Sequence, residues 1–210
     1  MSPAQERIIA TALNLLDTAG LEGLSMRKLA QVLHIQVPSL YWHFKNKEAL
    51  LEAVADTLLA PVARQMPNNA TWVEQLVHIG SEIRQALLSR RDGARFLATT
   101  YPISENVARV TTQMIHILKE AGADEQTATW SVMSLLYYII GFTIEEQALS
   151  SKNLSKKQHD DAIQAIFQKY PLGTAIISQI QTGNMDEWFD FGLRLPLDAL
   201  TLRLAQTKTP

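Results

Sequence analysis

The chain has 210 residues, no cysteine and a formal net charge of −2, and 47% of its residues are hydrophobic. This composition is ample for a packed core, and it excludes disulfide staples and Cys-based zinc sites. The charge balance argues against a protein that coats nucleic acid non-specifically, because that role needs a broadly basic surface. Residues 1–7 lack the pattern of a signal peptide, and no apolar run approaches the roughly 20 residues that span a bilayer. We therefore expect a cytoplasmic protein with no membrane partner.

The first 64 residues predict four helices. Ser2 and Pro3 begin the first, which Gly20 ends, and Ser25 caps a second that runs to about Leu33. His34 lies in the following turn, where a left-handed residue is required. Pro38 fits the first turn of a short third helix, and Asn46 caps a fourth over Lys47–Arg64, which Pro61 should kink or end.

The rest of the chain reads as a second, larger helical domain. The segment Met66–Ala70 breaks the pattern, so we predict domains over residues 1–63 and 64–210. Capping residues or apolar periodicity then predict helices beginning near Thr71, Asp92, Ser104, Asp124, Asp160 and Asn184. The helix from Asp124 to about Ser150 is apolar on more than one face and should be buried on several sides, and Ser150–Lys157 should be a loop.

Two further features complete the predicted fold. Pro196 lies inside the last predicted helix, four residues after Gly192, and should kink that helix without dividing it. No segment alternates with a period of two, so the fold class is all-α. We expect an N-terminal three-helix helix-turn-helix DNA-binding domain and a larger C-terminal helical domain.

The predicted helix-turn-helix concentrates positive charge. From Gly23 to Lys47 the charged residues are Arg27, Lys28, Lys45 and Lys47, with no acidic side chain. Such a local basic segment favours contact with a phosphate backbone. Spacing assigns packing roles to Leu29, Ala30, Leu33, Ile35, Leu40 and Phe44. The pair Tyr41–Trp42 could pack or bind, and its basic setting favours binding.

These residues resemble the tetracycline-repressor (TetR) family of transcriptional regulators. The resemblance is densest in RKLAQ from Arg27 and in LYWHFKNKEALL from Leu40, and it extends through Thr71–Trp72, the segment from Arg84 to Leu88, Arg91–Ala94 and Gly141–Gln147. It implies a homodimer whose N-terminal head binds double-stranded operator DNA and whose C-terminal domain binds a small-molecule effector and forms the dimer.

The resemblance assigns DNA contacts by position in the motif. Arg27 is the candidate for a bidentate contact with guanine. Base edges or thymine methyl groups would be touched by Val37, Pro38 and Tyr41. Phosphates would be held by Ser39, Trp42, His43 and Lys47. Because the repressor branch commonly has a polar residue at the Val37 position, we expect a palindromic operator that differs from those of the tetracycline repressors.

The same resemblance points to an effector pocket with altered chemistry. Ala63, Ile79 and Leu97 stand where the tetracycline repressor has His, Asn and a metal-ligating His. Because Ile and Leu cannot ligate a hard cation, we expect no metal, no cofactor and no magnesium–tetracycline. Matching polar residues persist at Thr100, Gln113 and Glu145, and candidate lining residues are Ile83, Met114, Met133, Tyr137 and Phe142. This composition predicts a mostly apolar organic ligand, although any single Met or aromatic could be ordinary core.

The resemblance also implies how an effector would act. A ligand would favour the arrangement that spaces the two heads wrongly for DNA, and so release a repressor. The segments Arg91–Pro102 and Lys47–Arg64 are the expected linkage.

The alternatives to a transcriptional regulator are an enzyme and a helical module that binds another protein. An enzyme is disfavoured because His34, His43, His78, His116 and His159 show no ligand spacing and no nucleotide-binding, zincin or hydrolase motif occurs. The adjacent pairs Glu145–Glu146 and Asp160–Asp161 point in different directions on a helix, which favours solvated faces or a pocket group over a catalytic dyad. A helical module that binds another protein through the helices from Asp124 and Met185 is the second alternative, and a homodimer is favoured over it.

Overall fold

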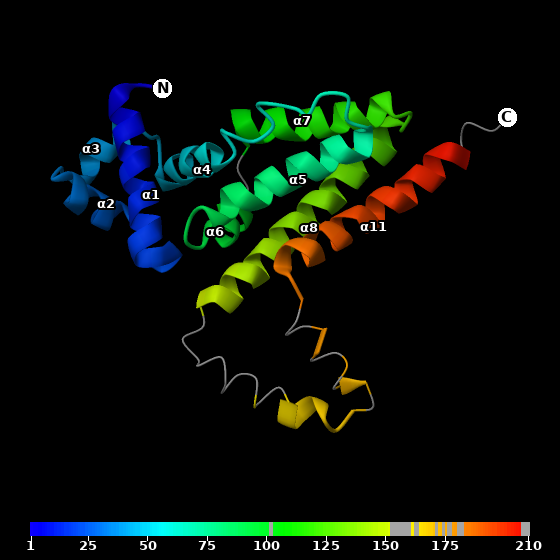
Figure 1. The fold of residues 1–210 in the computed structure, drawn as a ribbon. Helices are drawn as coiled ribbons and strands as arrows, with labels where there is room; N and C mark the ends of the chain where they lie inside the picture. The colour runs from blue at the N-terminus through cyan, green and yellow to red at the C-terminus, as the bar shows by residue number, and fades with distance from the viewer. Residues whose placement is uncertain are drawn as a thin grey trace.

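The structure, a computed structural model, describes residues 1–100, 103–151, 161, 164–170, 172–173, 175, 178–179 and 183–206. Its described part contains helices and turns without strands, so the predicted all-α class is confirmed (Figure 1). The helices are α1 (Pro3–Gly23), α2 (Met26–Leu33), α3 (Val37–Tyr41), α4 (Lys47–Leu58), α5 (Trp72–Leu88), α6 (Gly93–Thr100), α7 (Glu105–Glu120), α8 (Glu125–Ser151) and α11 (Met185–Gln206). Of the loop predicted over Ser150–Lys157, Ser150 and Ser151 belong to α8 instead, and residues 152–157 and most of the helix predicted from Asp160 lie outside the described residues.

Helices α1 to α3 form a head at one end of the molecule (Figure 1). Ser2 and Gln5 make a capping box at the start of α1, and Gly20 breaks the helical backbone with a φ of 69°. The head buries Leu29, Ala30, Leu33, Leu40 and Phe44, as predicted. Ile35 is exposed, so its predicted packing role is wrong. It lies in the turn between α2 and α3, outside both apolar helix faces.

Helix α4 leads from the head to the core. Asn46 caps it by accepting a hydrogen bond of 2.7 Å from the amide of Ala49, as predicted. The helix ends at Leu58, earlier than the predicted end at Arg64. Proline lacks an amide hydrogen and disfavours helical backbone in the residue before it, so Pro61 accounts for the early end. Turns and extended backbone then connect α4 to α5.

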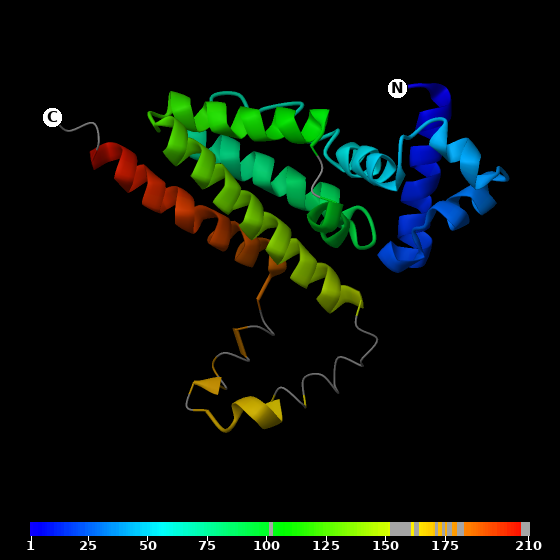
Figure 2. The ribbon, with the colours of Figure 1, turned by 180° about the vertical axis from the view of Figure 1, so that it is seen from behind.

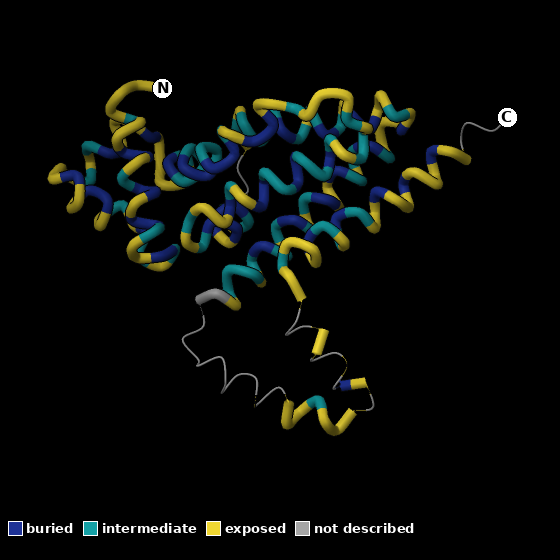
Figure 3. Tube along the Cα trace, viewed as in Figure 1, coloured by how far each residue is buried: buried dark blue, intermediate teal, exposed yellow. Residues whose placement is uncertain are grey.

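Helix α8 is the central element of the core, where it contacts α5, α6, α7 and α11. Figure 2 shows it from behind, with α11 along one side and α7 along the other. Its composition and length would allow it to cross a membrane, but its inner face packs on four helices of the core. That face buries Val132, Leu135 and Ile139, whereas Trp130 and Tyr137 are exposed. Figure 3 shows buried and less buried turns along this helix. The prediction that α8 is buried on several sides is therefore wrong for a single chain.

Helix α11 runs through Pro196 as one element, as predicted. Gly192 has a second role that the sequence did not indicate, because a side chain there would collide with the ring and hydroxyl of Tyr138. The Tyr138 hydroxyl instead approaches closely enough to donate to the carbonyl of Phe189 at 3.0 Å. Gly192 thus permits the close packing of α8 against α11.

Candidate nucleic-acid interface and effector-binding core

The turn between α2 and α3 has the geometry that a helix-turn-helix requires. Ser25 accepts a hydrogen bond from the amide of Lys28 at 3.2 Å and caps α2. His34 ends that helix in the left-handed conformation, with φ 56° and ψ 40°. Its amide donates to the carbonyls of Ala30 and Gln31, and the amide of Ile35 also donates to Ala30. These hydrogen bonds fix the C-terminal end of α2 and so set the direction in which the chain continues into α3.

The predicted DNA-contact residues lie at the surface of the head. Arg27 is exposed in the first turn of α2, Val37 and Ser39 are half-buried, and Pro38, Tyr41, Trp42, His43 and Lys47 are exposed in or after α3. Trp42 retains 87% of its surface, far more than a core residue would. The exposure of Tyr41 and Trp42 favours binding over packing for this pair.

A set of contacts ties the head to the core between α1 and α6. Asp17 pairs with Arg90 at 2.6 Å and accepts from the amide of Arg91 at 3.2 Å. Asp92 accepts from the amide of Leu21 at 3.0 Å, just after the backbone break in α1. The end of α1 is therefore held by the turn that precedes α6.

One group of predicted effector residues lies inside the core. Ile79 and Ile83 on α5, Leu97 on α6, Met114 on α7 and Ala63 are buried, and Thr100, Gln113 and Phe142 are half-buried. They come from helices that contact one another. The backbone of Ala63 has a φ of 54°, and its amide donates to Glu82 at 2.6 Å. Apolar side chains dominate this group.

A second group lies on the outer face of α8. Met133, Tyr137 and Glu145 are exposed there, away from the interior group. They share this face with Trp130, and the neighbouring face of α11 exposes Trp188, Phe191, Leu195 and Leu202. A groove of about 190 Å³, lined by residues that include Trp130 and Pro196, lies at the surface between these two packed helices. The apolar side chains of each helix, Glu145 left aside, are spaced by three, four or seven residues and make one apolar stripe on each helix.

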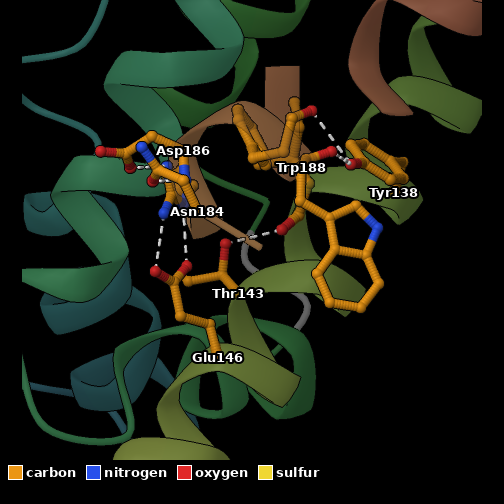
Figure 4. Close-up of polar contacts among 9 residues, drawn as sticks. Tyr138, Thr143, Glu146, Asn184, Asp186 and Trp188 are labelled. Atoms are coloured by element: carbon orange, nitrogen blue, oxygen red, sulfur yellow. Dashed lines mark hydrogen bonds and ion pairs between the residues drawn. The ribbon is translucent and has the colours of Figure 1, made fainter. Parts of the chain in front are cut away.

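The buried Arg84 of α5 pairs with Glu146 of α8 and with Asp186 at the start of α11, and Figure 4 labels these two carboxylate residues. Both oxygens of Glu146 accept from Arg84, at 2.8 and 2.6 Å, and Asp186 accepts from it at 2.7 Å. The guanidinium carbon lies 4.9 Å from the ring centre of Phe189 and 5.7 Å from that of Phe142. The hydrogen bonds to Glu146 raise the pKa of Arg84 above its usual value, against the opposing effect of burial.

This cluster around Arg84 was not predicted from the sequence. The pair Glu145–Glu146 suggested a solvated face or a pocket group, and the structure divides it, with Glu145 exposed and Glu146 against Arg84. The position of Arg84 in the sequence could have indicated that this arginine is buried. Arg84 occurs one turn after Gly80 and one turn before Leu87, within the buried stripe of α5.

The fold and the head together define a DNA-binding regulator, with a helix-turn-helix head joined to a helical core. A family model described as "Bacterial regulatory proteins, tetR family" matches residues 8–54, and one described as "Tetracyclin repressor-like, C-terminal domain" matches residues 66–204. The chain belongs to the TetR family of transcriptional regulators. Proteins of this family are regulators, not enzymes.

Individual relatives and solved structures point to the same family. The chain is 36% identical to the class G tetracycline repressor protein of Vibrio anguillarum, over 89% of this chain and 88% of that protein. The structure is similar to that of the TetR family protein ActR of Streptomyces coelicolor in complex with (S)-DNPA, with a TM-score of 0.81 and 27% identity over 95% and 98% of the chains. It is also similar to BioQ with its double-stranded DNA operator, with a TM-score of 0.68 and 28% identity over 94% and 98%.

Proposed function

We propose that this protein is a repressor that binds a palindromic operator as a homodimer and is released by a small, mostly apolar organic ligand. The observation that carries the proposal is the exposed, acid-free helix-turn-helix surface of a TetR-family head. In such a motif the second helix enters the major groove, which assigns that role to α3. The similarity to BioQ with its DNA operator supports this use of the head.

The homodimer is supported by the apolar stripe on α8 and α11. A contiguous set of exposed apolar side chains is typical of an interaction surface. A two-fold dimer uses the same patch on both subunits and would present two recognition helices to half-sites about 34–36 Å apart. A palindromic operator follows from this symmetry.

The effector class is supported by the chemistry of the interior group. Ile79 and Leu97 offer no oxygen or nitrogen ligand, whereas a magnesium ion is bound through oxygens. Thr100 and Gln113 supply the few polar groups that would orient an organic ligand within apolar walls. The complex of ActR with (S)-DNPA supports a small organic effector for this chain. Release follows if the ligand binds the arrangement whose heads no longer fit the operator.

Operator reading is tested by Arg27→Ala. This change is expected to cost about 1–3 kcal/mol of binding to the selected operator and to relax the base preference at one position per half-site. The matched control is Lys47→Ala, which should weaken binding to all sequences alike because it removes a phosphate contact. Both are measured by titration against operators carrying each base in turn. An Arg27→Ala variant with an unchanged base preference would contradict the assignment.

The effector class is tested by thermal unfolding with a panel of apolar organic compounds and with tetracycline plus magnesium. A ligand present at 100 times its dissociation constant should add about 2.7 kcal/mol of stability. We expect such a shift with an apolar organic compound and none with magnesium–tetracycline. Repeating the tetracycline experiment with a chelator is the control. Tight tetracycline binding that the chelator abolishes would overturn the proposed effector class.

A further inference from the structure

Helices α4 and α7 cap each other through side chains. Asp56, in the last turn of α4, accepts from the amide of Asn106 at 2.8 Å and from that of Val107 at 3.4 Å. These are free amides of the first turn of α7. Ser104 stands at the N-cap position, but its hydroxyl donates to Asp56 at 2.6 Å and makes no cap bond of its own. The predicted capping role of Ser104 is therefore taken by a carboxylate from another helix.

The reverse contact runs from α7 to the end of α4. The Arg109 guanidinium donates to the carbonyl of Val62 at 2.9 Å and to that of Leu59, the C-cap residue of α4, at 3.2 Å. Asn106 joins both halves, because its amide nitrogen donates to Asp56 at 2.8 Å while its oxygen accepts from Arg109 at 3.2 Å. We call the set Asp56, Ser104, Asn106 and Arg109 the α4–α7 joint.

The charges of this joint suit the helix ends that they meet. A helix carries partial positive charge at its N-terminus and partial negative charge at its C-terminus. Asp56 therefore stabilises the start of α7, and Arg109 stabilises the end of α4. Because each helix supplies a cap of the other, rotation of the end of α4 away from α7 would break the cap bonds of both helices.

Helix α4 also governs the position of the head. It begins at Lys47, a few residues after the end of α3, and it packs on α1. Its direction relative to the core therefore sets where α3 lies. In a two-fold dimer the separation and rotation of the two recognition helices would depend on this one direction in each subunit.

We propose that the α4–α7 joint fixes the half-site spacing that the dimer reads, with Asp56 and Arg109 as positioning residues for operator specificity. This inference rests on the proposed operator-binding homodimer. Neither residue needs to touch DNA, since their effect is on the geometry of the heads. Loss of the joint should therefore weaken discrimination between spacings more than it weakens binding to the preferred operator.

The test uses the operator selected by the full-length protein and two derivatives, with one base pair added or removed at the centre. One base pair changes the half-site separation by about 3.4 Å and the rotation by about a tenth of a turn. The wild-type protein should prefer the native spacing by about tenfold or more, the order of one mismatched base pair. Asp56→Asn, which removes the charge and keeps the shape, should reduce that preference to a few-fold.

Two more variants define the expected pattern. Arg109→Lys keeps the charge but loses the planar fork that reaches two carbonyls, so it should reduce the preference as Asp56→Asn does. The double variant, with both substitutions, should keep as much of the spacing preference as either single variant, because the two residues act as one unit.

The matched control is Asp124→Ala. It removes a cap bond of 2.7 Å to the amide of Thr127 at the start of α8, and Figure 1 places that end of the core far from the head. This variant should lose stability but keep the spacing preference. If the folded Asp56→Asn and Arg109→Lys proteins discriminate between operator spacings as well as wild type does, this inference is overturned and the proposed function still stands. A wild-type protein that selects no palindrome would instead contradict the proposed function.

Discussion

Replacing Arg84 by alanine is expected to lower the free energy of unfolding by about 3–5 kcal/mol, the cost of breaking a buried ion pair from one side. Arg84 is only 7% exposed, and its removal would leave Glu146 without its two charge-assisted hydrogen bonds. Two aromatic contacts, with Phe142 and Phe189, would be lost as well. Urea unfolding measures the effect, at one fixed protein concentration because the stability of the proposed dimer would depend on that concentration.

The matched control for this prediction is Asp186→Asn. The Asp186 side chain is 81% exposed, so its ion pair with Arg84 is screened and its loss should cost less than about 1 kcal/mol. A second variant, Arg84→Met with Glu146→Leu, should recover much of the stability, since an apolar pair of similar volume can replace a buried ion pair. An Arg84→Ala protein that is as stable as Asp186→Asn would contradict this description of the cluster.

Introducing a charge into the stripe on α8 is expected to dissociate the proposed homodimer. Tyr137 retains 64% of its surface within one chain, so Tyr137→Glu should fold, whereas burying the carboxylate between two subunits would carry a large desolvation cost. Gly141 provides a second probe, because a side chain there meets no atom of its own chain within 4 Å. Gly141→Arg should favour the isolated helix and yet oppose close packing of two subunits.

Light scattering after size exclusion measures the mass of each variant. Wild type should have the mass of two chains, and Tyr137→Glu and Gly141→Arg should shift towards one. The control is Ile103→Glu, which changes an apolar residue that is 94% exposed outside the stripe and should leave the dimer intact. Stripe variants that retain the dimer mass would show that another surface joins the chains.

Local features of this fold could be predicted from the sequence. The caps by Ser2, Ser25, Asn46 and Thr71 and the left-handed turn at His34 are confirmed, because each depends on residues within one helical turn. The continuous helix through Pro196 was predicted for a similar reason, from the residue four positions earlier.

Long-range contacts could not be predicted in the same way. Asp56 reaches the start of α7 and Arg84 reaches Glu146 across long stretches of chain, and nothing in either local pattern specifies the partner. The outer face of α8 was misjudged because its periodicity cannot separate an apolar face buried within one chain from an apolar face that stays exposed. The DNA-contact and effector residues were predicted from family resemblance and stay predictions.

The most direct test of the proposed function is selection of genomic DNA fragments by the purified full-length protein, followed by sequencing of the bound fragments and measurement of the mass of one complex. We predict that the fragments share one palindrome with half-sites about one turn of DNA apart, and that two chains bind each site. Uniform recovery of fragments without a shared sequence, or one chain bound per site, would contradict an operator-binding homodimer.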